Sequence, residues 1–220
     1  RRGETLRQAN VEVTQAVVDA AAAAGVKTCV YLSFPGADPV SKNQYLGSKG
    51  MAEAIIQHAG FAGAILRVPM ILGKDSPAAV QLRRMARAPL LPLVGGGAIR
   101  LQPIAEADVL AAIAWAIAAA PRPLRVLNLV GPETVTYAEL LRRVGDRLGT
   151  RPRVLPLPKA AVWLSAYLAG QLVPSLGWNR SAFDILFNEH LVDPAEAGDT
   201  VPLALTPVHV ALDQAYSTLD

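Results

Sequence analysis

The sequence predicts an α/β protein with a doubly wound parallel sheet, on three observations. Helices and strands alternate over the first 73 residues, with helices expected at 10–25 and 44–60 and strands at 27–34 and 62–73. Both strands are almost continuously apolar, as strands buried on two faces are. The hydrophobic fraction of 52% is typical of a packed globular chain. Such alternation with short connections favours a parallel sheet with helices on its faces.

The first helix is bounded by Asn10 as a plausible N-cap and by Gly25 as a stop. Later segments continue the mixed pattern. Helices are expected at 76–88, 105–121 and 137–149, and strands with turns at 89–104 and 125–136. We therefore expect two parts, residues 1–130 with a substrate-side insertion at about 74–104, and a smaller, mainly helical substrate or partner part at 131–220.

Charge and composition argue against several classes of function. The net charge is +3 and the pI about 9.2, but the arginines are spread along the chain without a basic stripe interleaved with aromatics. Nucleic-acid binding is therefore not expected. The single cysteine, Cys29, excludes a disulfide framework within the chain and suits a reducing, cytoplasmic location. His58, His190 and His209 lack metal-ligand spacing, so no metal site is expected.

The apolar segment at 160–178 is the part of the sequence that most resembles a membrane helix. Ser165, Gly170, Gln171 and Pro174 interrupt it, and its continuous apolar runs are too short to cross a bilayer. We expect no transmembrane segment here. The segment is interpreted as a buried helix or one that faces a protein partner.

Tyr45 and Lys49 are the strongest candidates for chemistry. Residues four apart lie on one face of a helix, and an ammonium beside a phenol lowers the phenol pKa from its usual value of about 10. Such a tyrosine can exchange a proton with a substrate hydroxyl or carbonyl. Taken alone, the pair is a weak signal and is more typical of two solvated side chains on a helix face.

The position of this pair favours a site. It follows a strand that ends at Ser33 and precedes a strand that leaves through Arg67, Val68 and Pro69. Ligands of open α/β sheets bind outside the carboxyl ends of the strands. Arg67 is either part of that site or a structural ion-pair partner.

Several segments in this order resemble the extended and atypical short-chain dehydrogenases/reductases. They are "NVEVTQAVVDAAAAAGVKTCVYLS", "YLGSK", "AILRVPMILG", "RLQPIAEADVLAAI" and "LNLVGPETVTYAELL". The chain is most similar to their NAD(P)-binding, epimerase/dehydratase-like branch. That branch includes the dehydrogenase-like accessory subunit of respiratory complex I and its bacterial relatives. The resemblance covers residues 5–150 and implies a Rossmann-like sheet and NAD or NADP as cofactor.

The resemblance also implies roles for individual residues. Tyr45 would be the general acid/base, and Lys49 its partner and a ligand of the cofactor ribose. Val68, Pro69 and Met70 would lie along the nicotinamide. Arg100 and Gln102 would face the substrate.

Two features depart from the family pattern. The glycine-rich turn that cradles the cofactor diphosphate is not found, and we expect the N-terminal strands that carry it to be missing from this chain. Active members carry a serine or threonine just past the strand that precedes the tyrosine. Here Phe34 occupies that slot and Ser33 stands one position early. Ser33 serves as the polar partner only if the register shifts by one residue.

Two functions remain open at this stage. The first is an NAD(P)-dependent oxidoreductase or epimerase that acts on the hydroxyl or carbonyl group of a small molecule. The second is a non-catalytic NAD(P)-binding accessory or assembly subunit of a larger complex, for example a membrane-associated respiratory complex, with the segment at 160–178 as a partner surface.

Overall fold

The computed structural model describes residues 7–162, 189–193 and 201–216. The chain divides into two compact units. Unit 1 comprises residues 1–69, 106–130 and 192–205, and unit 2 comprises 70–105, 131–191 and 206–220. Residues 70–105, which include the expected insertion, thus pack with residues after 131. Most of the apolar segment at 160–178 lies outside the described residues, so its role as a partner surface stays a prediction.

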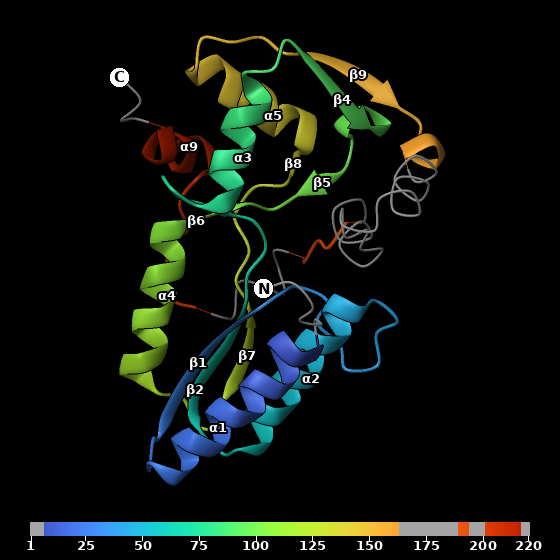
Figure 1. The fold of residues 1–220 in the computed structure, drawn as a ribbon. Helices are drawn as coiled ribbons and strands as arrows, with labels where there is room; N and C mark the ends of the chain where they lie inside the picture. The colour runs from blue at the N-terminus through green and yellow to red at the C-terminus, as the bar shows by residue number, and fades with distance from the viewer. Residues whose placement is uncertain (1–6, 163–188, 194–200, 217–220) are drawn as a thin grey trace. The chain divides into compact units, whose positions relative to one another are not determined.

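Unit 1 is built on a parallel sheet with the order β1–β2–β7, formed by Thr28–Ser33, Ala62–Arg67 and Arg125–Asn128. Helices α1 (Val13–Ala23) and α2 (Gln44–His58) cover one face of the sheet, and α4 (Glu106–Ala119) covers the other (Figure 1). This arrangement confirms the predicted α/β class with a parallel sheet and helices on both faces.

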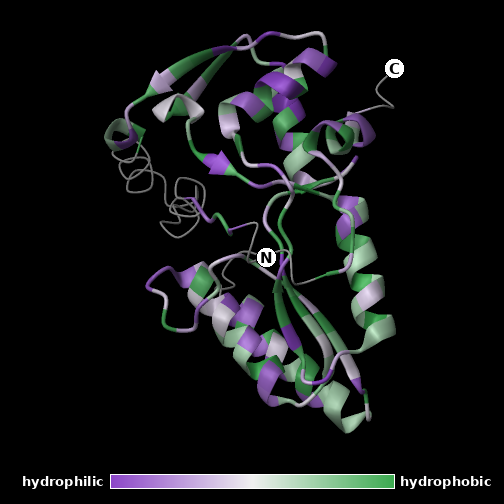
Figure 2. Cartoon of the chain, turned by 180° about the vertical axis from the view of Figure 1, so that it is seen from behind, coloured by the Kyte–Doolittle hydropathy of each residue, from purple (hydrophilic) through white to green (hydrophobic). Residues whose placement is uncertain are grey.

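The two faces of this sheet are packed by different side chains. Ile65 of β2 clusters with Val18 of α1 and Ile56 of α2. Its strand neighbours Ala64 and Leu66, both fully buried, point to the opposite face because side chains alternate along a strand. Figure 2 shows the strands coloured mainly hydrophobic, whereas α1 and α2 mix hydrophilic and hydrophobic residues. The sheet is therefore the apolar layer of the unit.

Unit 2 combines short strand pairs with helices. Strand β3 (Ile71–Leu72) pairs in parallel with β6 (Ile104–Ala105), and β4 (Leu90–Val94) with β9 (Arg153–Leu157). Strand β5 (Arg100–Leu101) pairs antiparallel with β8 (Val135–Thr136). Helices α3 (Pro77–Ala86), α5 (Tyr137–Arg147) and α9 (Val208–Tyr216) pack around one core that includes Leu82, Leu140 and Leu212. The helices at 76–88 and 137–149 are thus confirmed.

The beginning of the first helix differs from the prediction. A π-helical turn at Gln8–Glu12 leads directly into α1, so Asn10 lies inside helical backbone and is not an N-cap. Its side chain instead donates to Ser48 Oγ of α2 at 3.0 Å. A tertiary hydrogen bond has replaced the capping role that the residue type suggested. The end of the helix is as expected, since Gly25 follows it with a φ of +72°.

Gly63 gives a test of the β1–β2 contact. It has a φ of +116°, and a Cβ at this position would lie 2.1 Å from the carbonyl oxygen of Cys29. We expect Gly63→Ala to lower the free energy of unfolding by about 3 kcal/mol or more. Gly25→Ala is the matched control, because Gly25 also has a positive φ but nothing within 4 Å of its Cβ position. It should cost about 1 kcal/mol. Equal losses in urea unfolding would contradict the close approach of the two strands.

Candidate functional site

The candidate site lies where β1 and β2 end. Their last residues, Ser33 and Arg67, are register partners, and Val68 donates its backbone N–H to the carbonyl oxygen of Ser33 at 3.1 Å. A loop of residues 34–43 leads from β1 to α2. Tyr45 and Lys49 on the first turns of α2 thus face the carboxyl edge of the sheet, as the sequence indicated.

The loop ends in a cap that fixes the backbone of Tyr45. The Asn43 side chain accepts hydrogen bonds from the N–H groups of Tyr45 at 3.0 Å and Leu46 at 3.2 Å, so it satisfies donors that the helix cannot. The loop begins at Phe34, whose ring packs edge-on against the Tyr45 ring with 5.6 Å between centroids. Phe34 is therefore the residue after β1 that contacts the tyrosine.

Lys49 is held by β1. Its Nζ donates to the Tyr31 hydroxyl at 3.3 Å and to the Leu32 carbonyl oxygen at 3.2 Å. The ammonium also lies 4.9 Å from the centre of the Tyr31 ring, within the range of a cation–π contact. In the part of the chain that the structure describes, no hydrogen bond joins Lys49 to Tyr45. The lysine extends toward the strand ends, not toward the phenol.

This arrangement changes the expected electrostatics. Burial raises the pKa of Tyr45 above its ordinary value, whereas the sequence suggested that Lys49 would lower it. Burial lowers the pKa of Lys49, and the negative charge of Glu53 partly opposes that effect. Both groups are half-buried, and both pKa values move toward the neutral form because low polarity disfavours charge.

Ser33 contributes a buried hydroxyl at the end of β1. The residue is 5% exposed, and among the described residues its Oγ has no hydrogen-bond partner. An unpaired buried hydroxyl costs free energy. Ser33 lies two residues from Tyr31 and therefore on the same face of the strand. Its hydroxyl is available to pair with a group that enters this site.

The other predicted site residues fall in two places. Val68 is buried and Pro69 half-buried at the end of β2. Met70 lies in unit 2, where it packs on that unit's core. Arg100 and Gln102 also lie in unit 2, so the structure assigns the expected site residues to both units.

Arg100 already has an internal partner. Its Nε and Nη2 bind the Glu189 carboxylate at 2.7–3.1 Å, and its backbone N–H donates to the same carboxylate at 3.1 Å. The two side chains are 57% and 35% exposed. Because exposed ion pairs contribute little to stability, Glu189 holds this guanidinium only weakly.

Sequence reasoning missed Glu53 and Tyr31. Glu53 is 3% exposed, and its carboxylate binds Nε and Nη2 of Arg67 at 3.0 and 2.6 Å. Arg67 is thus in a structural ion pair, one of its two predicted roles. Spacing offered a signal for both residues. Glu53 follows Lys49 by four positions on α2, and Tyr31 precedes Ser33 by two on β1.

A separate hollow of about 430 Å³ lies in unit 2. Leu91, Leu141 and Val154 supply apolar lining, and the Arg142–Asp146 ion pair lies beside them. Both side chains of that pair are at least half exposed. The hollow contains none of the residues that the sequence selected.

The described residues bring polar groups together at the end of β1. Tyr45, Lys49 and the unpaired Ser33 hydroxyl are suitable partners for a ribose and a substrate oxygen. No strand-to-helix turn within the described ranges has the Gly-x-Gly-x-x-Gly spacing that holds a diphosphate. These residues also contain no group of three or more His, Cys, Asp or Glu able to hold a metal.

Some known proteins are similar to this chain in sequence. No protein-family model matches the chain. It is 28% identical over 139 residues to the mitochondrial NADH dehydrogenase [ubiquinone] 1 alpha subcomplex subunit 9 of Arabidopsis thaliana, covering 61% of this chain and 34% of that protein. It is 26% identical over 210 residues to the ceramide reductase of Caulobacter vibrioides, covering 90% of this chain and 64% of that protein. The chain thus spans less than two thirds of either relative.

Solved structures share the fold. The crystal structure of gox2253 matches with a TM-score of 0.75 at 21% identity, covering 97% of this chain and 72% of that one. WbmH of Bordetella bronchiseptica, solved in complex with NAD+, matches with a TM-score of 0.65 at 15% identity, covering 94% and 67%. The fold and the relatives together confirm the resemblance to the extended short-chain dehydrogenases/reductases, including the complex I subunit.

Within the described residues no helix has the length and apolar character needed to cross a membrane.

The charge of Glu53 gives a test of the site's electrostatics. Because Glu53 opposes the effect of burial on Lys49, Glu53→Gln should lower the Lys49 pKa further. Lysine side-chain NMR against pH measures this, with Asp19→Asn as control, since Asp19 is an exposed carboxylate bonded to Gln15. An unchanged Lys49 pKa would contradict the interaction.

The sign of the linkage to stability follows from that shift. The folded pKa of Lys49 lies below its unfolded value of about 10.4, so its charged form disfavours folding at neutral pH. This cost is lifted as the pH rises from the folded pKa to the unfolded one.

Proposed function

We propose that the chain is part of an NAD(P)-dependent oxidoreductase or epimerase that acts on a hydroxyl or carbonyl group, with Tyr45 as general acid/base. One observation carries this proposal. Tyr45 and Lys49 of α2 and the unpaired Ser33 hydroxyl of β1 lie where β1 and β2 end. That edge is where open α/β sheets bind their ligands.

Each residue has a separate task in this proposal. A Tyr45 phenol with a raised pKa is protonated at neutral pH, so it acts as the acid that gives its proton to a carbonyl oxygen during reduction. Ser33 Oγ donates a hydrogen bond to the same oxygen. In the reverse direction the phenolate accepts the proton of a substrate hydroxyl.

Lys49 supplies the positive charge of the site. Its ammonium reaches the end of β1 and is proposed to bind the cofactor ribose there. Bound NAD or NADP would supply the hydride chemistry. Val68 and Pro69 would line the nicotinamide side at the end of β2. Two structures with the same fold support NAD or NADP as the cofactor. WbmH was solved with NAD+, and MoeE5 was solved with UDP-glucuronic acid and NAD.

The class of substrate is also part of the proposal. The ceramide reductase relative is similar over 90% of this chain, and MoeE5 shares the fold at a TM-score of 0.58. A panel should therefore contain long-chain ketones of the sphingoid type and UDP-sugars. Arg100 and Gln102 are proposed to contact the substrate, with Arg100 released from Glu189 by an anionic group.

A non-catalytic NAD(P)-binding accessory subunit is the second candidate. Phe34 packs on Tyr45 where active relatives of the family carry a hydroxyl, and Lys49 is engaged by Tyr31 and Leu32. The similarity to the complex I subunit supports it as well. This candidate predicts nucleotide binding without turnover, and association with a larger assembly.

The acid/base role gives the central test. Tyr45→Phe removes the proton donor and should lower turnover by at least about a hundredfold while leaving the Kd for NADH or NADPH within about twofold. Calorimetric titration and steady-state kinetics on the protein as its gene encodes it measure the two effects.

Tyr137→Phe is the matched control for that test. Tyr137 is a second half-buried tyrosine whose pKa burial raises, and its hydroxyl donates to Met85 of unit 2. It should leave turnover unchanged. Full turnover in Tyr45→Phe would exclude the acid/base role. Tight nucleotide binding without turnover in the unaltered protein would favour the accessory subunit.

A further inference from the structure

The Glu53–Arg67 pair joins three of the segments that surround the candidate site. Glu53 lies on α2, two helical turns after Tyr45 and one after Lys49. Arg67 is the last residue of β2. The guanidinium binds both carboxylate oxygens, and its Nη2 also donates to the Ala37 carbonyl oxygen at 2.9 Å. One side chain thus links α2, β2 and the loop at 34–43.

The loop reaches that contact because two glycines let it lie against α2. A Cβ on Gly50 would be 2.3 Å from the backbone of Asp38 and Pro39, and a Cβ on Gly47 would be 3.1 Å from the Ser41 carbonyl oxygen. The Asp38 N–H also donates to the carbonyl oxygen of Leu46 at 3.3 Å. The middle of the loop therefore packs directly on the helix that carries Tyr45 and Lys49.

Both ends of the same loop touch Tyr45. Phe34, its first residue, packs on the Tyr45 ring. Asn43, its last residue, caps the helix at the Tyr45 N–H. The Ala37 carbonyl that Arg67 holds lies three residues after Phe34. Loss of the Arg67–Ala37 contact is therefore expected to let Phe34 move, and with it the position of the Tyr45 ring.

Stability alone is a weak reason for this pair. Replacing a buried ion pair by apolar residues of similar volume is often neutral or stabilising, and neighbouring positions of unit 1 are apolar. Bidentate guanidinium–carboxylate geometry instead gives a fixed orientation. The third contact, to the loop, is one that an apolar pair would not supply.

We propose that Glu53 and Arg67 are positioning residues that hold the loop at 34–43 on α2 and thereby fix the Tyr45 ring at the carboxyl edge of the sheet. The importance of this for chemistry rests on the proposed function. The attachment of the loop to α2 through Glu53 and Arg67, called the tether below, does not depend on that function. It is therefore tested by measurements that need no enzyme activity.

The test compares Arg67→Lys with Arg143→Lys. Both arginines bind carboxylates and both side chains are 25% exposed, but Arg143 pairs with Glu133 and Glu139 in unit 2. Lysine keeps the positive charge but lacks the planar fork with which Arg67 binds both carboxylate oxygens and Ala37. Neither substitution adds or removes a trypsin site, since trypsin cleaves after lysine and arginine alike.

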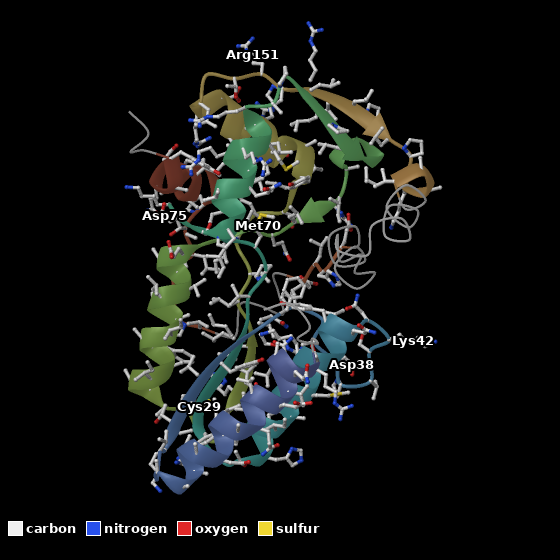
Figure 3. The ribbon with its side chains drawn as sticks, viewed as in Figure 1. Cys29, Asp38, Lys42, Met70, Asp75 and Arg151 are labelled. Carbon is white, nitrogen blue, oxygen red and sulfur yellow. The ribbon has the colours of Figure 1, made fainter. Side chains whose placement is uncertain are left out.

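Limited trypsin cleavage after Lys42 reports on the loop. Lys42 is exposed on the outer side of the loop, as Figure 3 shows. In Arg67→Lys the rate of this cleavage should rise about tenfold, since loss of a charge-assisted hydrogen bond increases the population of the open loop. In Arg143→Lys it should stay within about twofold.

NMR reports on the tyrosine ring. The nuclear Overhauser effect between the ring protons of Phe34 and Tyr45 should weaken in Arg67→Lys and persist in Arg143→Lys. General destabilisation would weaken it in both variants. Where turnover is detected, Arg67→Lys should lower kcat about tenfold or more with little change in KM. Glu53→Gln is the second variant, with the same expected direction, if Arg67→Lys does not fold.

The outcomes separate this proposal from the enzyme proposal. An unchanged cleavage rate and an intact Phe34–Tyr45 contact in a folded variant would overturn the positioning role, as would an equal effect of Arg143→Lys. If the tether responds as expected but Tyr45→Phe keeps full turnover, the acid/base proposal falls and the tether stands.

Discussion

The parallel pairing of β1 with β2 is the constraint on which the candidate site depends. Parallel neighbours cannot be joined by a tight turn, so the chain must cross over through α2. Six register pairs from Thr28–Ala62 to Ser33–Arg67 set the two strand ends level. Because α2 returns along the sheet, its first turns lie beside those ends. The crossover places a helical tyrosine and lysine next to a strand serine.

That geometry also determines the electrostatics. Lys49 lies half-buried against β1, where burial lowers its pKa and Glu53 opposes the effect. The Glu53 charge is in turn matched by Arg67 at the end of β2. Charges therefore alternate from Lys49 through Glu53 to Arg67 across the helix and the neighbouring strand. Each buried charge has an opposite charge nearby, which is the condition under which ionised groups persist inside a protein.

Much of unit 1 was predictable from the sequence because local patterns determine it. The two strands, the helix at 44–60 and the shared edge of Ser33 and Arg67 follow from hydrophobic periodicity and parallel topology. The expected burial was correct for β2 but wrong for β1, where most residues are half-exposed and Leu32 is 39% exposed. Asn10 was misread because its side chain bonds Ser48, 38 residues away. The Arg67–Ala37 and Lys49–Tyr31 contacts also join distant residues, and spacing within a single helix does not reveal the partner on a neighbouring strand.

Unit 2 was less predictable for a related reason. Its strand pairs β3–β6 and β5–β8 contain only two residues in each strand, too few for a clear period-2 pattern. Strand β4 finds its partner β9 across some sixty residues of sequence. The Arg100–Glu189 contact spans 89 residues. Only tertiary structure could show that the predicted substrate arginine has an internal carboxylate partner.

The two candidate functions make different demands on Ser33, Phe34 and Tyr45. An acid/base site requires Tyr45 to meet a substrate oxygen, with Ser33 as its polar partner. A binding-only site is compatible with Phe34 packed edge-on against the Tyr45 ring. The Ser33 hydroxyl is the polar group that the first function requires beside Tyr45 and that the second does not, and among the described residues it has no hydrogen-bond partner. The loop at 34–43 bears on both functions, because its first residue packs on the Tyr45 ring and its last residue caps the helix that carries Tyr45.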